Sequence, residues 1–242
     1  MAGWLPMVEV LQSGQTAPKR LICFAYAGGN AAMYLPWQAR LGADIEICAV
    51  QLSPRHGSGE IHGSFPALIR DIAQAIQPLL DRPYALFGHS LGALVAFELS
   101  RFIKLMHLPT PTRLIVSGCD APMHKSDAKR VHDLPHDEFI AELRQKKGTP
   151  EAVLDAPELL ALLLPAVRAD FALVEAYQYR ANIRLDMPLD VFAGQKDEIS
   201  DESLAPWLAE TNAASAVHWF EGGHFFINSE TKTVINRLHD LL

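Results

Sequence analysis

The sequence predicts an α/β fold: a mostly parallel sheet flanked by helices, with an inserted helical lid. Short apolar runs typical of buried strands alternate with longer runs of helical spacing. Between residues 121 and 186 the alternation stops and only helical patterns remain. A Gly-His-Ser-Leu-Gly pentapeptide joins one strand to the helix after it. The 242 residues, 49% of them hydrophobic, suit a single domain over residues 1–242 with 121–186 as the lid insertion.

The first half of the chain supplies three strands and three helices. Residues 1–18, with Pro6, Gly14 and Pro18, predict an irregular N-terminal segment. The strands are unbroken apolar runs, and the helices show apolar side chains three and four residues apart. The expected elements are strand 20–26, helix 31–41, strand 44–51, helix 64–80, strand 84–87 and helix 91–102.

The second half resumes the alternation after the lid. Within the lid, 157–179 has apolar residues on more than one face, which indicates a lining for an apolar ligand or burial in the core. Pro165 is expected to kink this helix. The expected elements are strand 113–119, lid helices 134–143 and 157–179, strand 188–194, helix 201–213, strand 216–220 and a final helix 228–242.

The pentapeptide Gly88-His-Ser-Leu-Gly92 identifies a candidate nucleophile, Ser90. A strand that turns within one residue into a helix forces the central residue into a strained, positive-φ conformation. The turn lifts the hydroxyl of Ser90 above the carboxyl edge of the sheet, at the N-terminus of the next helix. An ordinary serine in a glycine-rich turn is the alternative.

Two more groups with suitable chemistry follow strands that end at the same edge. Asp197 leaves the penultimate strand, and His224 follows the last strand behind two glycines. The chain order Ser90, Asp197, His224 is that of the α/β-hydrolase fold. Imidazole titrates near neutrality and can take the serine proton, and a carboxylate orients the imidazole. These three residues are the predicted catalytic triad.

The acid and the base each have rivals in the sequence. Asp120 leaves the strand after that of the nucleophile and is the alternative acid, whereas Asp190 lies inside a strand and is disfavoured. His89 flanks Ser90, and its side chain should point away from the hydroxyl. The other histidines lack a comparable context: His56, His62, His107, His124, His132, His136, His218 and His239.

A loop of small residues after strand 20–26 is expected to supply part of an oxyanion hole. The donors are predicted to be the backbone N–H groups of Ala27 and Leu91. A simple glycine turn leading into the next helix would have the same sequence. Arg55 lies in a polar loop at the same edge and could bind an anion, although solvation is the commoner fate of a loop arginine.

Composition excludes several classes of function. A net charge of −7 argues against nucleic acid, which requires a basic face. Three cysteines do not make a disulfide framework and are expected to be buried thiols. His132 and His136, four residues apart, lack further ligands, so no metal site is predicted. Without a signal peptide or a ~20-residue apolar span, we expect a soluble cytoplasmic protein with no membrane partner.

Several segments together resemble the type II thioesterases of non-ribosomal peptide and polyketide assembly lines. The resemblance covers about residue 20 to the end of the chain. The most specific segment is the Leu-Pro-x-x-Arg-x-Asp-Phe run in the lid. The segments that carry it are Leu21-Ile-Cys-Phe-Ala-Tyr-Ala-Gly-Gly29, Gly88-His-Ser-Leu-Gly92, Gly148-Thr-Pro150, Leu163-Leu-Leu-Pro-Ala-Val-Arg-Ala-Asp-Phe171 and Gly222-Gly-His-Phe-Phe226.

The resemblance implies an activity and a partner. Such enzymes hydrolyse acyl thioesters from the phosphopantetheine arm of acyl or peptidyl carrier proteins, so the substrate carries the phosphopantetheine and no cofactor is expected. Carried over, the family's triad falls on Ser90, Asp197 and His224. Related product-releasing thioesterases use the position of Asp120 instead. This chain departs at Tyr26, where the family usually has histidine, and at Ser53-Pro-Arg55, where it usually has Pro-Gly-Arg.

The sequence leaves three other kinds of function open on the same fold. One is a product-releasing thioesterase, small-molecule esterase or lipase. The second is a catalytically silent binding protein. The third is an acyltransferase with an acceptor other than water, because sequence alone does not show how water reaches the site.

Overall fold

A seven-stranded sheet forms the centre of the molecule. The structure is a computed structural model and describes residues 8–14, 16–52, 64–124 and 130–242. The strand order is β1-β3-β2-β4-β5-β6-β7, and only β1 runs antiparallel to its neighbour. This confirms the predicted mostly parallel sheet. The strands are β1 (Glu9–Gln12), β2 (Lys19–Phe24), β3 (Ile45–Gln51), β4 (Tyr84–His89), β5 (Arg113–Ser117), β6 (Leu189–Gly194) and β7 (Ser215–Phe220).

Strand β1 corrects one expectation, because residues 1–18 were predicted to be irregular. Glu9–Gln12 has exposed ends and two half-buried apolar residues between them, and it pairs as the edge strand with β3. Four residues are too few for a clear alternating pattern, and the edge position supplies the pairing that the local sequence does not reveal.

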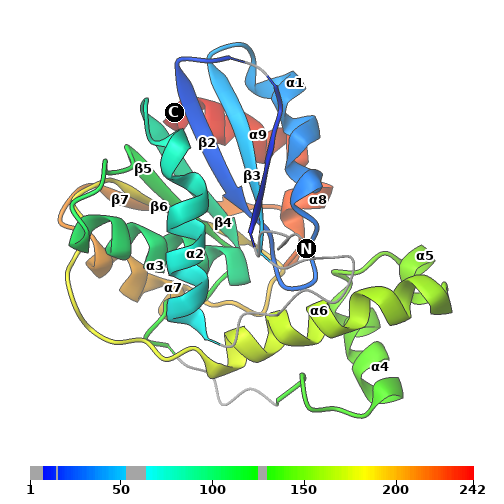
Figure 1. Cartoon of the computed structure of the whole chain (residues 1–242). Coiled ribbons are helices and arrows are strands. Elements are labelled where there is room, and N and C mark those ends of the chain that lie inside the picture. Colours follow the sequence, from blue (N-terminus) through cyan, green and yellow to red (C-terminus); the bar gives the residue numbers. More distant parts are fainter. Residues whose placement is uncertain (1–7, 15, 53–63, 125–129) are drawn as a thin grey trace, which may run out of the picture.

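Helices cover both faces of the sheet, as expected for strands that are apolar on both sides. Figure 1 shows α2 and α3 in front of the sheet and α9 behind it. The front layer contains α2 (Phe65–Ile76), η2 (Gln77–Leu79), α3 (Leu91–Leu105), α7 (Asp201–Leu204) and η3 (Ala205–Glu210). The rear layer contains η1 (Ala31–Trp37), α1 (Gln38–Leu41), α8 (Phe226–Ser229) and α9 (Thr231–Leu241).

Four expected helices are divided into shorter pieces, one of which is 64–80, where α2 is followed by the 3₁₀-helix η2 with its proline Pro78. The regions 31–41 and 201–213 each begin or continue as a 3₁₀-helix that contains a proline, Pro36 or Pro206. Proline has no amide N–H and crowds the preceding turn, which disfavours a continuous α-helix. The C-terminal region breaks at Glu230, between α8 and α9.

Between β5 and β6 the chain forms a separate helical layer of α4 (His136–Lys146), α5 (Glu151–Leu154) and α6 (Pro157–Ala176). Figure 1 shows these helices together at one end of the sheet. They share a small core that includes Phe139, Leu143 and Leu164. Arg168 joins the pieces: its guanidinium stacks 4.1 Å from the ring centre of Phe139 and donates to the carbonyl of His132 at 2.6 Å. Helix α6 continues as one helix through Pro165.

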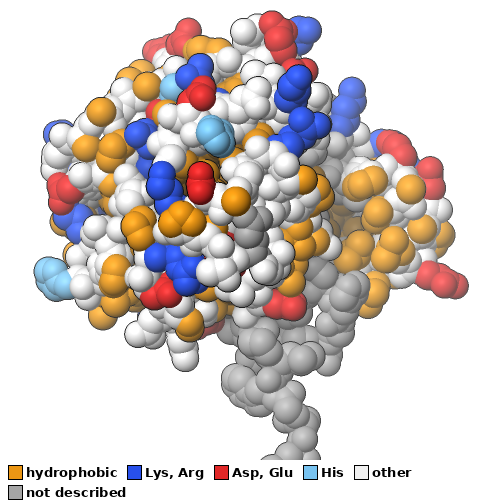
Figure 2. Space-filling view, turned by 90° about the horizontal axis from the view of Figure 1, so that it is seen from above, with side chains coloured by type: hydrophobic (Ala, Val, Ile, Leu, Met, Phe, Trp, Pro, Cys, Tyr) orange, Lys and Arg blue, Asp and Glu red, His pale blue; other side chains and the backbone are white. Residues whose placement is uncertain are grey.

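Two of the three cysteines are buried thiols, as expected, and the third is only half-buried. Cys23 and Cys48 are fully buried in strands, and burial raises the pKa of both thiols, whereas Cys119 is half-buried. In the described part of the chain, no helix is long and apolar enough to cross a membrane. On the face seen in Figure 2, basic and acidic side chains are interspersed rather than gathered into one basic area.

Candidate active site

Ser90 occupies the junction between β4 and α3 in the strained conformation that the pentapeptide predicts. Its φ is 56° and its ψ −116°, and its amide donates to the Ser117 carbonyl at 2.8 Å. The two flanking glycines allow this turn. A Cβ on Gly88 would lie 1.9 Å from the Gly92 carbonyl oxygen, and one on Gly92 would lie 2.1 Å from the Phe24 carbonyl oxygen. The close approach of these backbones therefore requires glycine at both positions.

Asp197 and His224 are joined by a hydrogen bond. His224 Nδ1 lies 2.9 Å from Asp197 Oδ2, and the other carboxylate oxygen accepts the Glu198 amide at 2.8 Å. A carboxylate only accepts hydrogen bonds, so Nδ1 carries a proton in this contact, and in a neutral imidazole Nε2 is then the atom with the lone pair. The Asp197 side chain is 6% exposed and that of His224 34% exposed, so the acid is buried and the imidazole reaches solvent.

The loops that carry this pair are fixed to one another. The Lys196 amide donates to the Gly222 carbonyl at 2.8 Å, which connects the loop after β6 to the loop after β7. Gly222 has φ +94°, a conformation that favours glycine. Gly194 is required at the end of β6, because a Cβ there would lie 2.5 Å from the Gly223 carbonyl oxygen. Asp197 and His224 therefore meet through rigid backbone contacts.

His89 places the imidazole of His224 at the edge where Ser90 lies. The His89 ring is fully buried, hydrogen-bonds the Ser117 hydroxyl at 2.9 Å and packs 5.2 Å from the ring centre of His224. Burial, and next the nearby His224, lower the pKa of His89 well below its usual value, so this ring is neutral at neutral pH. Ser90 and His224 are both described, and no hydrogen bond joins the Ser90 hydroxyl to His224.

The loop after β2 forms a tight turn beside Ser90. The Gly29 amide donates to the Tyr26 carbonyl at 2.8 Å, and Gly28 has φ +77°, the geometry of a type II turn. The Gly28 amide donates to Asp170 of α6 at 2.8 Å. Within the described part of the chain, the amides of Ala27 and Leu91 donate no hydrogen bond. The assignment of these two amides to an oxyanion hole stays a prediction.

The rival residues make other contacts. Asp120 forms no hydrogen bond with His224 among the described residues. Asp190 is buried and contacts both Arg113 and His218. His132 hydrogen-bonds Glu175 of α6. No cluster of possible metal ligands occurs among the residues that the structure describes.

Some of the sequence predictions fall outside the described residues. These are Arg55, His56, His62 and the Ser53-Pro-Arg55 departure.

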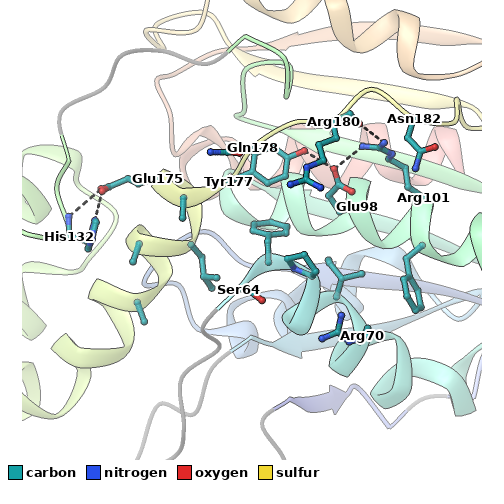
Figure 3. Close-up of a pocket in the computed structure, with 18 of the residues that line it drawn as sticks. Ser64, Arg70, Glu98, Arg101, His132, Glu175, Tyr177, Gln178, Arg180 and Asn182 are labelled. Atoms are coloured by element: carbon teal, nitrogen blue, oxygen red, sulfur yellow. Dashed lines mark hydrogen bonds and ion pairs between the residues drawn. The ribbon is translucent and has the colours of Figure 1, made fainter.

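A cavity of about 840 Å³ opens between α2, α3 and the C-terminal half of α6. Figure 3 shows Glu98 and Arg101 on one wall and His132 with Glu175 at the other end. Ser90, Asp197 and His224 are not among the described residues that line this cavity. Glu98 lies eight residues beyond Ser90 along α3, about 12 Å at the rise of an α-helix. The cavity is therefore beside the candidate site rather than over it.

Two contacts from the lid to the candidate site were not predicted from the sequence. One is the hydrogen bond that the Gly28 amide donates to the Asp170 carboxylate. The other is the hydrogen bond from the Tyr26 hydroxyl to the Gly148 carbonyl at 3.2 Å. Asp170 could have been suspected as one of the few charged residues in a mostly apolar helical stretch, but its partner lies 142 residues away.

Comparison with known proteins identifies the family. The family described as "Thioesterase domain" matches residues 19–242. The chain belongs to the thioesterase family. Among curated relatives, this thioesterase is 38% identical over 214 residues to gramicidin S biosynthesis protein GrsT of Aneurinibacillus migulanus, covering 87% of this chain and 84% of that protein. It is 34% identical over 227 residues to thioesterase PikA5 of Streptomyces venezuelae, covering 92% and 80%.

Solved structures agree with the fold of this thioesterase. The type II thioesterase BorB from the borrelidin biosynthetic cluster superposes with a TM-score of 0.87 at 30% identity, covering 96% of each chain. ClbQ from the colibactin NRPS/PKS pathway superposes with a TM-score of 0.84 at 29% identity, covering 93% of this chain and 96% of its own. These neighbours confirm both the α/β-hydrolase fold and the family resemblance.

Proposed function

We propose that this thioesterase is a type II, or editing, enzyme that hydrolyses acyl thioesters from the phosphopantetheine arm of carrier proteins. Its relatives are named for gramicidin S biosynthesis and for the borrelidin and colibactin clusters, which supports a carrier-protein partner in a peptide or polyketide assembly line. The observation that carries the chemistry is the Asp197–His224 hydrogen bond beside the strained Ser90 turn.

The first chemical step transfers the acyl group to Ser90. His224 Nε2 takes the hydroxyl proton while Ser90 Oγ attacks the thioester carbonyl carbon, and Asp197 stabilises the imidazolium that forms. The carbonyl oxygen becomes an oxyanion that accepts hydrogen bonds from the amides of Ala27 and Leu91. The carbon–sulfur bond then breaks, and the proton on Nε2 passes to the departing pantetheine thiolate. The product of this step is an acyl-Ser90 ester.

Water completes the reaction with the same groups, and Ser90 now leaves instead of attacking. Nε2 takes a proton from water, the hydroxide adds to the ester carbonyl, and the second oxyanion occupies the same two amides. The carbon–oxygen bond to Ser90 breaks, its oxygen recovers the proton from Nε2, and free acid leaves. The two steps together consume only the thioester and water, so the proposal includes no cofactor.

We propose that the chain acts as one domain over 1–242, with 121–186 as a lid. Helix α6 contacts the turn at Gly28, and Gly148 contacts Phe225, the residue after His224. A Cβ on Gly148 would lie 2.6 Å from the Phe225 ring. The helical layer therefore contacts the loops of both the oxyanion hole and the base, the position of a lid over the reacting groups.

The test is hydrolysis of acylated carrier proteins followed by mass spectrometry. The wild-type chain should release free acid, and Ser90→Ala should reduce release to the uncatalysed rate. Ser100→Ala is the matched control, because Ser100 lies on the helix that follows Ser90 and, among the described residues, its hydroxyl donates only to the Ala96 carbonyl. Equal release by wild type and Ser90→Ala contradicts the proposal.

Two further measurements separate the alternatives. Faster turnover of short p-nitrophenyl esters than of the acylated carrier protein would favour a small-molecule esterase. A fluorophosphonate that fails to label Ser90 would favour a catalytically silent binding protein.

A further inference from the structure

Helix α6 of the lid touches the oxyanion turn with two residues of one helical face, Val167 and Asp170. The Asp170 carboxylate is fully buried and accepts the Gly28 amide at 2.8 Å. A Cβ on Gly28 would lie 3.2 Å from Val167 Cγ1, so the helix packs directly against the turn. A buried carboxylate is costly unless it is hydrogen-bonded, which favours keeping this contact closed.

The hydrogen bond acts on the peptide group at the centre of the turn. In a type II turn this group joins the second and third residues, here Ala27 and Gly28. The Ala27 N–H belongs to the preceding peptide group, between Tyr26 and Ala27, so Asp170 acts on it by fixing the turn in place rather than by orienting that N–H directly. Asp170 holds the N–H of Gly28 toward α6 and thereby keeps it away from the reacting carbonyl. The Ala27 amide, one residue earlier, is left without an internal partner among the described residues.

The same turn has a second connection to the lid. Its first residue, Tyr26, donates from the hydroxyl to the Gly148 carbonyl at 3.2 Å, before α5. Its ring packs edge-on against Phe225 at 4.8 Å, next to His224. Two residues of a four-residue turn are therefore fixed by lid segments that lie more than twenty residues apart in the chain.

We infer that Asp170 is a positioning residue that sets the Ala27 amide for the oxyanion, so that the oxyanion hole is complete only when α6 is seated on the sheet domain. The inference rests on the proposed function and adds a role for the lid. A chain whose lid is displaced would still hold the Asp197–His224 pair, because no lid residue takes part in that hydrogen bond. It would lose stabilisation of the transition state rather than the base.

The test compares Asp170→Leu with Asp170→Asn. Leucine removes the acceptor at similar size, whereas asparagine keeps a carbonyl oxygen for the Gly28 amide. Loss of one oxyanion donor typically lowers turnover about 10²–10³-fold. We expect kcat to fall by about that factor in Asp170→Leu with KM changed less than about threefold, and to remain within about tenfold of wild type in Asp170→Asn. Val167→Ala controls for lost packing on the same helical face and should retain most of the wild-type kcat.

A second readout separates positioning from general loss of structure. An acyl-chain trifluoromethyl ketone adds to Ser90 and places an oxyanion in the hole, so its inhibition constant should rise in parallel with the fall in kcat. If Asp170→Leu does not fold, as judged by circular dichroism, Asp170→Ser is measured in its place. The serine side chain is too short for its hydroxyl to reach the Gly28 amide.

The outcomes distinguish this inference from the proposed function. A fully folded Asp170→Leu variant with wild-type kcat and wild-type ketone affinity overturns the positioning role while hydrolysis by the wild type still stands. A fall in kcat of equal size in Val167→Ala and Asp170→Leu also overturns it, since packing alone would then account for the effect. Equal release by wild type and Ser90→Ala instead refutes the proposed function.

Discussion

Replacing Asp197 by asparagine should reverse the polarity of its hydrogen bond to His224. The structure fixes the direction of this change, because Asp197 Oδ1 accepts the Glu198 amide at 2.8 Å. The carbonyl oxygen of asparagine will keep that bond, which leaves its NH₂ group facing His224 Nδ1. Nδ1 must then accept, and the ring proton moves to Nε2, where it prevents the ring from taking the Ser90 proton. The same exchange in a serine-protease triad costs about 10⁴-fold in kcat, or about 5.5 kcal/mol of transition-state stabilisation.

Asp120→Asn is the matched control for this prediction. It changes the alternative acid in the same way, but Asp120 makes no hydrogen bond to His224 in the described structure. Steady-state kinetics on an acylated carrier protein should show a loss of about 10⁴-fold for Asp197→Asn and nearly wild-type turnover for Asp120→Asn. The opposite ranking would transfer the role of the acid to Asp120 and refute the reasoning from the Asp197–His224 contact.

Two further predictions concern the surroundings of the site. Tyr26→Phe removes the hydrogen bond to Gly148 and should lower the free energy of unfolding by about 1 kcal/mol. It should also speed hydrogen exchange over residues 147–150. Tyr84→Phe, which removes a hydrogen bond to Pro109 away from the lid, should not change exchange over those residues. His89 has a pKa well below 6.5 in the folded state, so the unfolded chain binds its proton first and stability falls as pH drops below about 6.5. Urea unfolding should show this slope, up to about 1.4 kcal/mol per pH unit, in wild type but not in His89→Asn; identical slopes would contradict it.

The parallel sheet could be predicted because its evidence is local. Each buried strand is an apolar run long enough to read alone, and β4 is followed by a pentapeptide whose glycines have one stereochemical purpose. The division of helices at Pro36 and Pro206 follows from the missing proline amide and was available from the sequence. Strand β1 was missed because a four-residue edge strand depends on its partner rather than on its own pattern.

The groups that position the candidate site are harder to predict. His89 was expected to point away from Ser90, and the contact with the His224 ring joins residues 135 positions apart. Asp170 and Tyr26 act through hydrogen bonds to backbone atoms. A backbone N–H or carbonyl can make such a bond whichever side chain its residue carries. Sequence composition at Gly28 or Gly148 therefore contains no information about the partner. Only folding of the lid onto the sheet reveals these contacts.

The lid segment that carries the family resemblance has a separate structural role for each of its charged residues. Arg168 assembles the lid itself, since its guanidinium stacks on Phe139 and donates to the carbonyl of His132. Asp170, two residues later on the helix, connects the assembled lid to the oxyanion turn. A lysine at 168 would keep the charge but lose the planar stacking, and an alanine at 170 would keep the helix but release the turn. Arg168 therefore holds the lid segments together, and Asp170 connects the assembled lid to the turn that contains the Ala27 amide.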